Sequence, residues 1–424
     1  MTEERLPLAE LLAKAGWCHT GVPAYRAEII PVEPVWVVPA KGVVVMRIVV
    51  VGAGILGAST AYHLAREGAD VTVVDQSYDG RATAAGAGIL CPWPSRVDDA
   101  IFYSLYAAGA RYYAELVQAL AEHGKSDVGY RRSGALVVST DPAELTAVEG
   151  LLRERCYDAP EMGAVDRVSP HEAQALFPPL RPDFAGVHIA GGARVDGRRC
   201  AAALLRAAQR YGATIERGEA RLIASHDRLT GVGLDSIRID ADQVVLAAGA
   251  WAPALLRPLG LHLSIEPQRG QILHLCLPGQ DTRAWPVILP PGAHYLLAFD
   301  DRIVAGATRE NDAGFDHRVT AAGQMELLSH ALDVAPGLAG ATIIETRVGF
   351  RPVGPGLRPL LGRATAIDGL LIGNGLGAAG LTIGPLAGRL LADEALGRPT
   401  SLDLTPFDPL RRQAPAAHLA PTLR

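Results

Sequence analysis

Three glycines and one acidic residue form the clearest chemical pattern in the first part of the sequence. Gly52, Gly54 and Gly57 follow a β-branched run, and Asp75 ends the next apolar run. In a strand–turn–helix unit, such glycines permit a tight turn, a close approach of backbone to pyrophosphate, and close packing of helix on sheet. The helix N-terminus offers N–H groups to phosphates, and the acid accepts hydrogen bonds from a ribose diol. The pattern predicts a dinucleotide site without deciding which dinucleotide binds.

A second run of small residues, 81–89, separates the possible dinucleotides. It reads Arg-Ala-Thr-Ala-Ala-Gly-Ala-Gly-Ile, so a loop there lies flat along a long cofactor, with the Thr83 hydroxyl and backbone N–H groups facing phosphates. A flexible loop without a ligand is the alternative interpretation of the same residues. Taken with the first motif, this run favours FAD over NAD(P).

Hydrophobic periodicity predicts the elements that must position these residues. The run 48–51 is typical of a buried parallel strand, and the pattern over 55–66 predicts a helix that Gly68 ends. A strand over 71–74 completes a right-handed βαβ unit. Later α/β elements are predicted at 199–211 (helix), 214–215 and 244–247 (strands).

Two regions interrupt this α/β pattern. The first, 99–164, opens with a helical pattern over 103–123, and the second, 263–341, holds strand-like pieces at 271–275 and 295–299. Together they predict an inserted substrate-binding domain. The remaining expected parts are an N-terminal extension (1–45), a cofactor domain (46–98, 165–262 and 342–410) and a C-terminal tail (411–424).

Composition excludes several classes of protein. The 424 residues carry a net charge of −5 and no long basic run, which argues against nucleic acid as a partner. The five cysteines (18, 91, 156, 200 and 276) are scattered, so neither a disulfide framework nor a metal site is predicted, and we expect a cytoplasmic protein. The start lacks a signal-peptide pattern, and the most apolar run is too short for a transmembrane segment.

The extension 1–45 has two interpretations. It is an arm that packs on the body or on a second subunit of a homo-oligomer, or it is an addition without a catalytic part; we favour the second.

The two glycine-rich motifs resemble the D-amino acid oxidase superfamily, especially its branch of glycine oxidases, sarcosine oxidases and D-amino acid dehydrogenases. Later stretches are similar to that family in the same order, and the similarity spans roughly 46–410. These stretches are Val195-Asp196, 244–251, 267–271, 306–310, 349–352 and the glycine-rich 373–382 with Pro385.

The resemblance implies an α/β fold: a discontinuous Rossmann-like FAD-binding domain of the glutathione-reductase type, with an inserted α+β substrate domain. The FAD is expected to be non-covalent, because no cysteine lies near Arg351-Pro352 to carry it. The residues expected to bind FAD are Gly52, Gly54, Ile55, Leu56, Gly57, Asp75, Gln76, Arg81, Thr83, Ala84, Ala85, Gly88, Ile89, Ala220, Ala248, Gly249, Trp251, Arg351, Gly377, Gly380, Leu381 and Thr382.

The resemblance also implies oxidative deamination of a small amino acid or secondary amine of the D-amino acid, glycine or sarcosine type. A hydride passes from Cα to flavin N5, and the imine hydrolyses to an oxo acid. Arg351 is expected to pair with the substrate carboxylate through its two-donor fork, and Tyr295 to donate a further bond to it. The helix after Gly380 is expected to direct partial positive charge to the flavin N1/O2 edge. Oxygen or a quinone-linked carrier then accepts the electrons.

Three places depart from the family pattern. Gly356-Leu357 replaces an Asp-Gly pair, Leu376 replaces a histidine, and Ala378 stands where glycine oxidases have an arginine. These changes weaken a specificity for glycine and favour a larger or less polar substrate. Two other functions stay open: an NAD(P)-dependent dehydrogenase, and a flavoprotein whose FAD is structural and oxidises no amine.

Overall fold

The structure is a computed structural model that describes residues 45–122, 124 and 127–411. The expectations for the N-terminal extension and the C-terminal tail fall almost entirely outside these residues. Among the described residues, no helix combines the length and the apolar character needed to cross a membrane.

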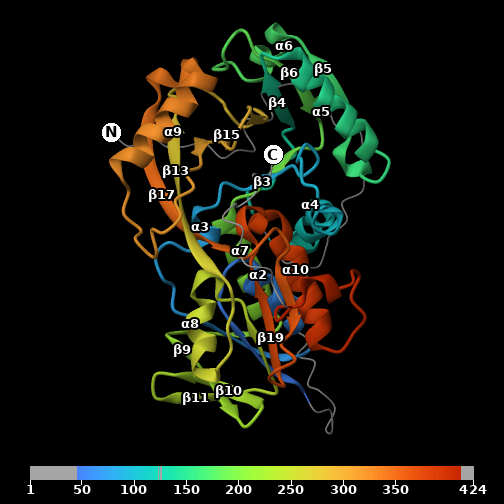
Figure 1. The fold of residues 1–424 in the computed structure, drawn as a ribbon, viewed down its shortest axis with the longest axis vertical. Coiled ribbons are helices and arrows are strands. Elements are labelled where there is room, and N and C mark those ends of the chain that lie inside the picture. Colours follow the sequence, from blue (N-terminus) through green and yellow to red (C-terminus); the bar gives the residue numbers. More distant parts are fainter. Residues whose placement is uncertain (1–44, 123, 125–126, 412–424) are drawn as a thin grey trace, which may run out of the picture. The chain divides into compact units, whose positions relative to one another are not determined.

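A six-stranded sheet forms the base of the cofactor half (Figure 1). The β-branched residues of its central strand face both ways: Ile48 and Val50 enter one hydrophobic core, and Val49 and Val51 enter another. The central strand pairs in parallel with both neighbours, as predicted for a βαβ unit. In spatial order the strands are β18 (Leu360–Arg363), β19 (Leu370–Asn374), β12 (Gln243–Leu246), β1 (Arg47–Val51), β2 (Asp70–Asp75) and β8 (Thr214–Arg217).

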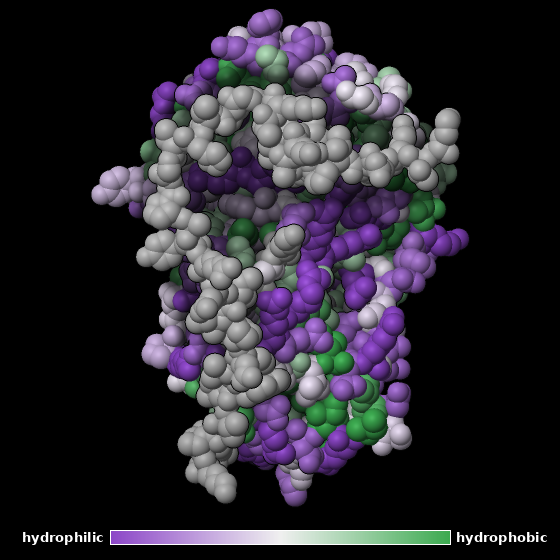
Figure 2. Space-filling view, turned by 180° about the vertical axis from the view of Figure 1, so that it is seen from behind, coloured by the Kyte–Doolittle hydropathy of each residue, from purple (hydrophilic) through white to green (hydrophobic). Residues whose placement is uncertain are grey.

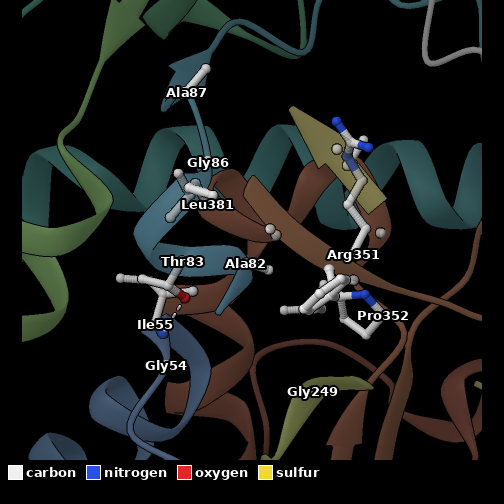
Figure 3. A pocket seen from close by; sticks show the side chains of 18 of the residues that line it. Gly54, Ile55, Ala82, Thr83, Gly86, Ala87, Gly249, Arg351, Pro352 and Leu381 are labelled. Atoms are coloured by element: carbon white, nitrogen blue, oxygen red, sulfur yellow. Dashed lines mark hydrogen bonds between the residues drawn. The ribbon is translucent and has the colours of Figure 1, made fainter. Parts of the chain in front are cut away.

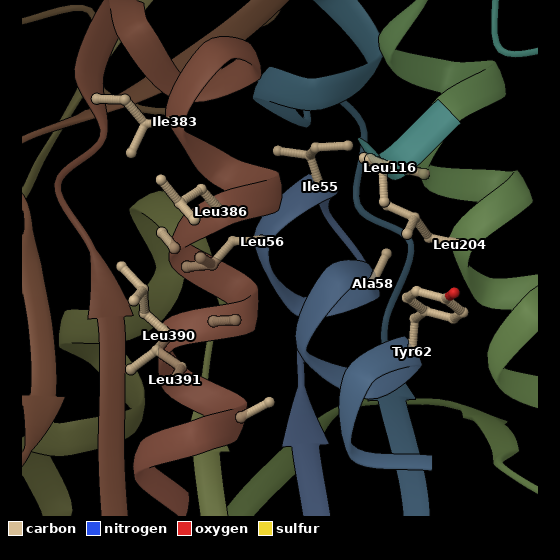
Figure 4. Packing of buried hydrophobic residues seen from close by; sticks show 14 of the residues in the cluster. Ile55, Leu56, Ala58, Tyr62, Leu116, Leu204, Ile383, Leu386, Leu390 and Leu391 are labelled. Carbon is tan, nitrogen blue, oxygen red and sulfur yellow. The ribbon is translucent and has the colours of Figure 1, made fainter. Parts of the chain in front are cut away.

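Helices cover one face of this sheet, and Figure 4 shows how their apolar side chains interdigitate. They are α2 (Ile55–Arg66), α4 (Ala100–Glu122), α7 (Gly197–Arg210) and α10 (Gly380–Ala395). Helices α2 and α10 approach closely because Gly388 has no side chain: a Cβ there would lie 2.7 Å from the Leu56 carbonyl oxygen. The Ser59 hydroxyl donates to the Pro385 carbonyl oxygen at 2.7 Å across the same contact. The predicted helix over 55–66 is confirmed.

The other face of the sheet lies against a small antiparallel sheet and one short helix. These elements are β9 (Ala220–Ser225), β10 (Arg228–Leu234), β11 (Ile237–Asp240) and α8 (Ala252–Leu256). Short 3-10 turns occur at Pro160–Met162, Gly249–Trp251, Arg257–Leu259, Pro336–Gly340, Gly377–Ala379 and Thr405–Phe407.

An eight-stranded sheet forms the second half. In spatial order its strands are β17 (Thr342–Val353), β13 (Glu266–Cys276), β16 (Ile303–Gly306), β15 (Tyr295–Ala298), β14 (Val287–Leu289), β4 (Ala135–Ser139), β6 (Ala185–Ile189) and β5 (Val165–Val168). Helices α5 (Pro142–Arg155), α6 (Pro170–Leu176) and α9 (Ala321–Val334) complete this half (Figure 1). The long hydrogen-bonded pair of β13 with β17 runs from here toward the first sheet.

Sheet membership differs from the expected division of the chain. The segments 165–262 and 342–410 were assigned to the cofactor domain, yet β5, β6 and β17 pair within the eight-stranded sheet. The reason is long-range pairing: β6 is antiparallel to β4, which no local pattern reveals. The run 81–89 also differs from the expected loop, because it holds one helical turn, α3 (Ala82–Ala85), and strand β3 (Ile89–Leu90), which pairs with β7 (Ala193–Arg194).

Figure 2 shows the opposite side of the molecule, where polar residues predominate among the described atoms and apolar ones gather in its lower part. A mixture of this kind is ordinary for the surface of a folded protein.

Candidate active site

One pocket of about 480 Å³ brings the two glycine-rich stretches of the chain together. Gly54 from the first stretch and Gly380 from the last line the same cavity, with Arg351 from the second sheet. Figure 3 shows Gly54, Leu381 and Arg351 around it. Every residue that the sequence assigned to cofactor or substrate lines this pocket, except Gly57 and Ala84.

The three glycines of the first motif have distinct reasons to be glycine. Gly52 has a φ of +109°, and a Cβ there would lie 2.4 Å from the Ala247 carbonyl oxygen. A Cβ on Gly57 would lie 1.9 Å from the Gly52 carbonyl oxygen, so Gly57 serves packing rather than the cavity. Gly54 meets no backbone: its Cβ would come only within 3.3 Å of the Thr83 hydroxyl. Close approach of a cofactor therefore explains Gly54, and the residues present fit a dinucleotide.

The carboxylate of Asp75 is held in a fixed orientation at the end of β2. The Ala53 amide donates to one of its oxygens at 2.7 Å, and the Ser77 amide donates to the other at 2.6 Å. Arg81 lies 3.6 Å from the carboxylate. These contacts aim the carboxylate at the pocket, where Gln76 follows it along the wall.

Thr83 connects the second motif to the first. Its hydroxyl oxygen accepts a hydrogen bond from the Ile55 amide at 2.9 Å, which occupies the first turn of α2, where Gly54 provides no side-chain cap (Figure 3). The hydroxyl hydrogen stays available to donate to a phosphate. Ala84 turns away from the cavity, and its carbonyl oxygen accepts from Arg198 at 2.8 Å.

Hydrogen bonds join the C-terminal glycine-rich stretch to two other segments of the pocket, at Gly249 and at Ile89. The Asn374 amide donates to the Gly249 carbonyl oxygen at 2.8 Å, and the Thr382 hydroxyl donates to the Ile89 carbonyl oxygen at 3.0 Å. Asn374 is buried, lines the pocket and was not singled out from the sequence. Helix α10 begins at Gly380 without a side-chain cap, so its N–H groups direct partial positive charge into the pocket.

Arg351 and Tyr295 lie on a floor that two glycines provide. A Cβ on Gly270 would lie 2.5 Å from Nη1 of Arg351, and a Cβ on Gly306 would lie 2.5 Å from the Tyr295 hydroxyl oxygen. The missing side chains of Gly270 and Gly306 thus leave the space in the sheet that Arg351 and Tyr295 occupy. The Nη1 group of Arg351 donates to the Thr308 carbonyl oxygen at 3.1 Å.

Arg309 is a second cation in the pocket that the sequence did not single out. Burial, and to a lesser degree Arg309, lowers the pKa of Arg351; burial also lowers the pKa of Arg309. In the part of the chain that the structure describes, neither guanidinium joins an ion pair, and the neighbouring Glu310 pairs with Arg269. Two desolvated cations without a carboxylate partner are suited to bind an anion, and the pair Arg309 and Arg351 is our predicted anion site. The stretch 306–310 is similar to the family, but an Arg next to a Glu in a sequence is typical of an ordinary surface pair and does not by itself predict a pocket residue.

The departures from the family pattern divide into two groups. Leu376 and Ala378 line the pocket, whereas Gly356 and Leu357 do not. Leucine at 376 and alanine at 378 therefore remove polar side chains from the wall of the pocket itself. Within the described residues, no group of three or more His, Cys, Asp or Glu side chains is placed to hold a metal ion.

The chain is similar to known proteins in sequence and in structure. The sequence pattern of the family described as FAD dependent oxidoreductase matches residues 47–394. The crystal structure of iminodiacetate oxidase from Chelativorans sp. BNC1 is 53% identical with a TM-score of 0.84, over 86% of this chain and 99% of that one.

Two relatives by sequence cover the same part of the chain. The oxidoreductase YurR of Bacillus subtilis, itself uncharacterized, is 51% identical over 363 residues, which are 85% of this chain and 98% of that protein. Glycine oxidase of Pseudomonas aeruginosa is 34% identical over 373 residues, or 86% of this chain and 99% of that protein. The NAD(P)-dependent alternative is thereby excluded. The chain belongs to the D-amino acid oxidase family of FAD-dependent oxidoreductases, which act on carbon–nitrogen bonds.

Proposed function

We propose that the protein oxidises a small secondary amine or amino acid whose nitrogen is joined to a carboxymethyl or similar group. An N-substituted glycine of the iminodiacetate or sarcosine type is the substrate class we favour. In that reaction the amine, water and an electron acceptor give a shorter amine, an oxo acid and the reduced acceptor. The observation that carries the proposal is the pair of partly buried guanidinium groups of Arg309 and Arg351 in the pocket of the two glycine-rich motifs.

The chain's own residues account for binding and orientation. The fork of Arg351 suits a carboxylate, and Arg309 adds a second positive charge on the same wall. Tyr295 lies beside them over Gly306, where its hydroxyl donates to the substrate. FAD, when bound, supplies the hydride-accepting chemistry at the carbon next to the nitrogen. The residues that would hold it are Gly54, Asp75, Thr83, Gly249 and Gly380, together with their neighbours along the pocket.

Two observations favour an N-substituted glycine over glycine itself. The relative named iminodiacetate oxidase is 53% identical, against 34% for the glycine oxidase. Ala378 also replaces the arginine of glycine oxidases and leaves that wall small and uncharged. A second substituent on nitrogen therefore meets less steric opposition there.

Anaerobic reduction of the flavin tests the proposal. Purified protein is mixed without oxygen with iminodiacetate, sarcosine, glycine, and D- and L-alanine, and the loss of flavin absorbance is followed. We expect rapid bleaching by iminodiacetate or sarcosine and slow bleaching, or none, by glycine. The absence of bleaching by every amine would instead support an FAD with a structural role. Oxygen uptake during turnover in air then decides between oxygen and a quinone-linked carrier as acceptor.

A further inference from the structure

The carboxylate of Glu310 accepts four hydrogen bonds. One oxygen accepts from the Gln271 amide at 2.8 Å and from the Thr308 hydroxyl at 2.7 Å. The other accepts from Nε and Nη2 of Arg269 at 3.0 and 2.6 Å. A carboxylate has about four acceptor sites, so donors of the protein itself saturate the carboxylate of Glu310.

This network lies on the side of the sheet away from the pocket cations. Gln268 is opposite Arg351 in the pairing of β13 with β17, and Gly270 provides the floor under the Arg351 guanidinium. Side chains alternate along a strand, so Arg269 and Gln271 point to the other side, where they are buried. The charge of Glu310 is neutralised there by Arg269, whose Nη1 also lies 2.9 Å from Asp316.

The network fixes the short segment that follows β16. The regular pairing of β13 with β16 stops at Gly306. Beyond it, the backbone N–H of Thr308 donates to the backbone carbonyl oxygen of Gln271 at 3.1 Å. The Thr308 hydroxyl accepts a hydrogen bond from the backbone N–H of Gln271 at 2.9 Å. Arg269 and Glu310 exchange backbone hydrogen bonds of 3.0 and 2.9 Å. Three backbone hydrogen bonds and one to the Thr308 hydroxyl therefore continue the pairing with β13 over 308–310, and the side-chain network of Glu310 is joined to them.

That segment carries parts of the anion site on its other side. The Thr308 carbonyl oxygen accepts from Nη1 of Arg351, and Arg309 stands between the two residues that the network anchors. We propose that Glu310 is a positioning residue: from behind the sheet, through Thr308 and Arg269, it holds Arg309 and the partner of Arg351 in the arrangement that binds the substrate carboxylate. This inference rests on the proposed function.

Charge and position predict opposite effects of Glu310→Gln. Loss of a negative charge near two cations would by itself strengthen the binding of an anion. Loss of the hydrogen bonds that fix 308–310 weakens the binding of an anion. The side-chain amide of glutamine has a donor NH₂ group in place of one acceptor oxygen, so buried donors of Arg269 or Gln271 lose their partner. The sign of the change in carboxylate affinity therefore identifies the role.

The experiment compares holoenzymes of wild type, Glu310→Gln and a matched control, Glu345→Gln. Glu345 also accepts a hydrogen bond from an arginine, Arg347, in the same sheet, but its titratable neighbours are Arg347 and His274 rather than residues of 307–310. Dissociation constants for acetate are read from the flavin spectrum, and KM and kcat from turnover of the substrate. For Glu310→Gln we expect roughly tenfold weaker acetate binding and a similar rise in KM, with kcat and FAD content nearly unchanged. The control should match wild type.

A second pair of variants covers the case in which Glu310→Gln does not fold. Thr308→Ser keeps the hydroxyl that links Gln271 to Glu310, whereas Thr308→Val keeps the shape without it. We expect weak acetate binding for Val and near wild-type binding for Ser. Equal or tighter acetate binding by Glu310→Gln, or equal binding by the two Thr308 variants, would overturn the inference alone. Wild-type protein that binds no carboxylate would overturn the proposed function and this inference with it.

Discussion

The guanidinium of Arg351 lies flat against Gly270, on the neighbouring strand of the same sheet, where a Cβ would come within 2.5 Å of Nη1. A side chain at position 270 would fill the space that the guanidinium of Arg351 occupies.

Gly270→Ala should therefore disturb substrate binding and leave the cofactor in place. The new methyl group displaces the guanidinium, so we expect KM for a carboxylate amine to rise by about tenfold or more while the FAD content stays the same. Steady-state kinetics and the flavin-to-protein absorbance ratio measure the two effects. Gly150→Ala is the control: it lies in α5 with open space around its Cβ, and kinetics should not change. Unaltered KM in Gly270→Ala would contradict the placement of Arg351.

Removal of either pocket arginine should reduce turnover of carboxylate substrates. Loss of one partner of a buried charge pair costs ~2–5 kcal/mol, which corresponds to roughly 30-fold to several thousand-fold in kcat/KM. We expect a loss in this range for Arg351→Ala and a smaller loss for Arg309→Ala. Arg228→Ala, in an exposed pair with Asp368, should behave as wild type. If Arg351→Ala retains full kcat/KM, Arg351 does not contact the substrate.

Three stacked aromatic rings close one edge of the predicted FAD site. Trp251 lines the pocket and lies between Tyr78 and Phe315, with ring centroids at 5.2 and 5.1 Å. Such ring pairs contribute about 0.5–1.5 kcal/mol each. Phe315→Ala should accordingly release FAD a few-fold to about tenfold faster, measured by the rise in free flavin fluorescence after dilution. Tyr157→Ala, at a side chain that is 91% exposed, serves as the control. The same release rate in both variants would argue against a role for the stack.

His274 predicts a stability loss in acid. Burial, reinforced by Arg347 and Arg302, lowers its pKa from 6.5 to about 3. A lowered pKa means that the folded state binds fewer protons than the unfolded state between these values. His274 therefore contributes its full stability above pH 6.5, and this contribution falls toward pH 3 by at most ~1.4 kcal/mol per pH unit.

His274→Leu should flatten the dependence of the free energy of unfolding on pH between 6.5 and 3. Both ring nitrogens lack a hydrogen-bond partner among the described residues, so an apolar side chain loses little there. Urea titrations at several pH values measure the slope, and His226→Gln at an exposed position is the comparison. An identical slope in His274→Leu and wild type would show that this histidine does not carry the effect.

The cofactor half was predictable because its signals are local. The spacing of Gly52, Gly54 and Gly57 dictates a backbone turn, and the continuous β-branched run around Val49 and Val50 marks a strand buried on both faces. The residues behind the anion site were not predictable. Arg269 and Glu310 meet only because β13 runs past the end of β16, a relationship that no short window of sequence contains.

Two further differences have one local and one long-range cause. The run at 82–85 was expected to be a loop because its residues are small, but alanine has a high helix propensity, and the segment forms a helical turn. Strand β6 was placed in the wrong half because its partner, β4, lies far away in the sequence. Sequence patterns thus predicted most of the segments that line the pocket. Which of their side chains come together depends on strand pairing, which the sequence patterns do not show.

The most direct test of the central claim is a crystal structure of the holoenzyme grown with acetate or iminodiacetate. We predict one FAD that contacts both Gly54 and Gly380, and a ligand carboxylate bound by Arg351 with Arg309 beside it. A carboxylate bound elsewhere, or an FAD that does not reach Gly380, would contradict the account.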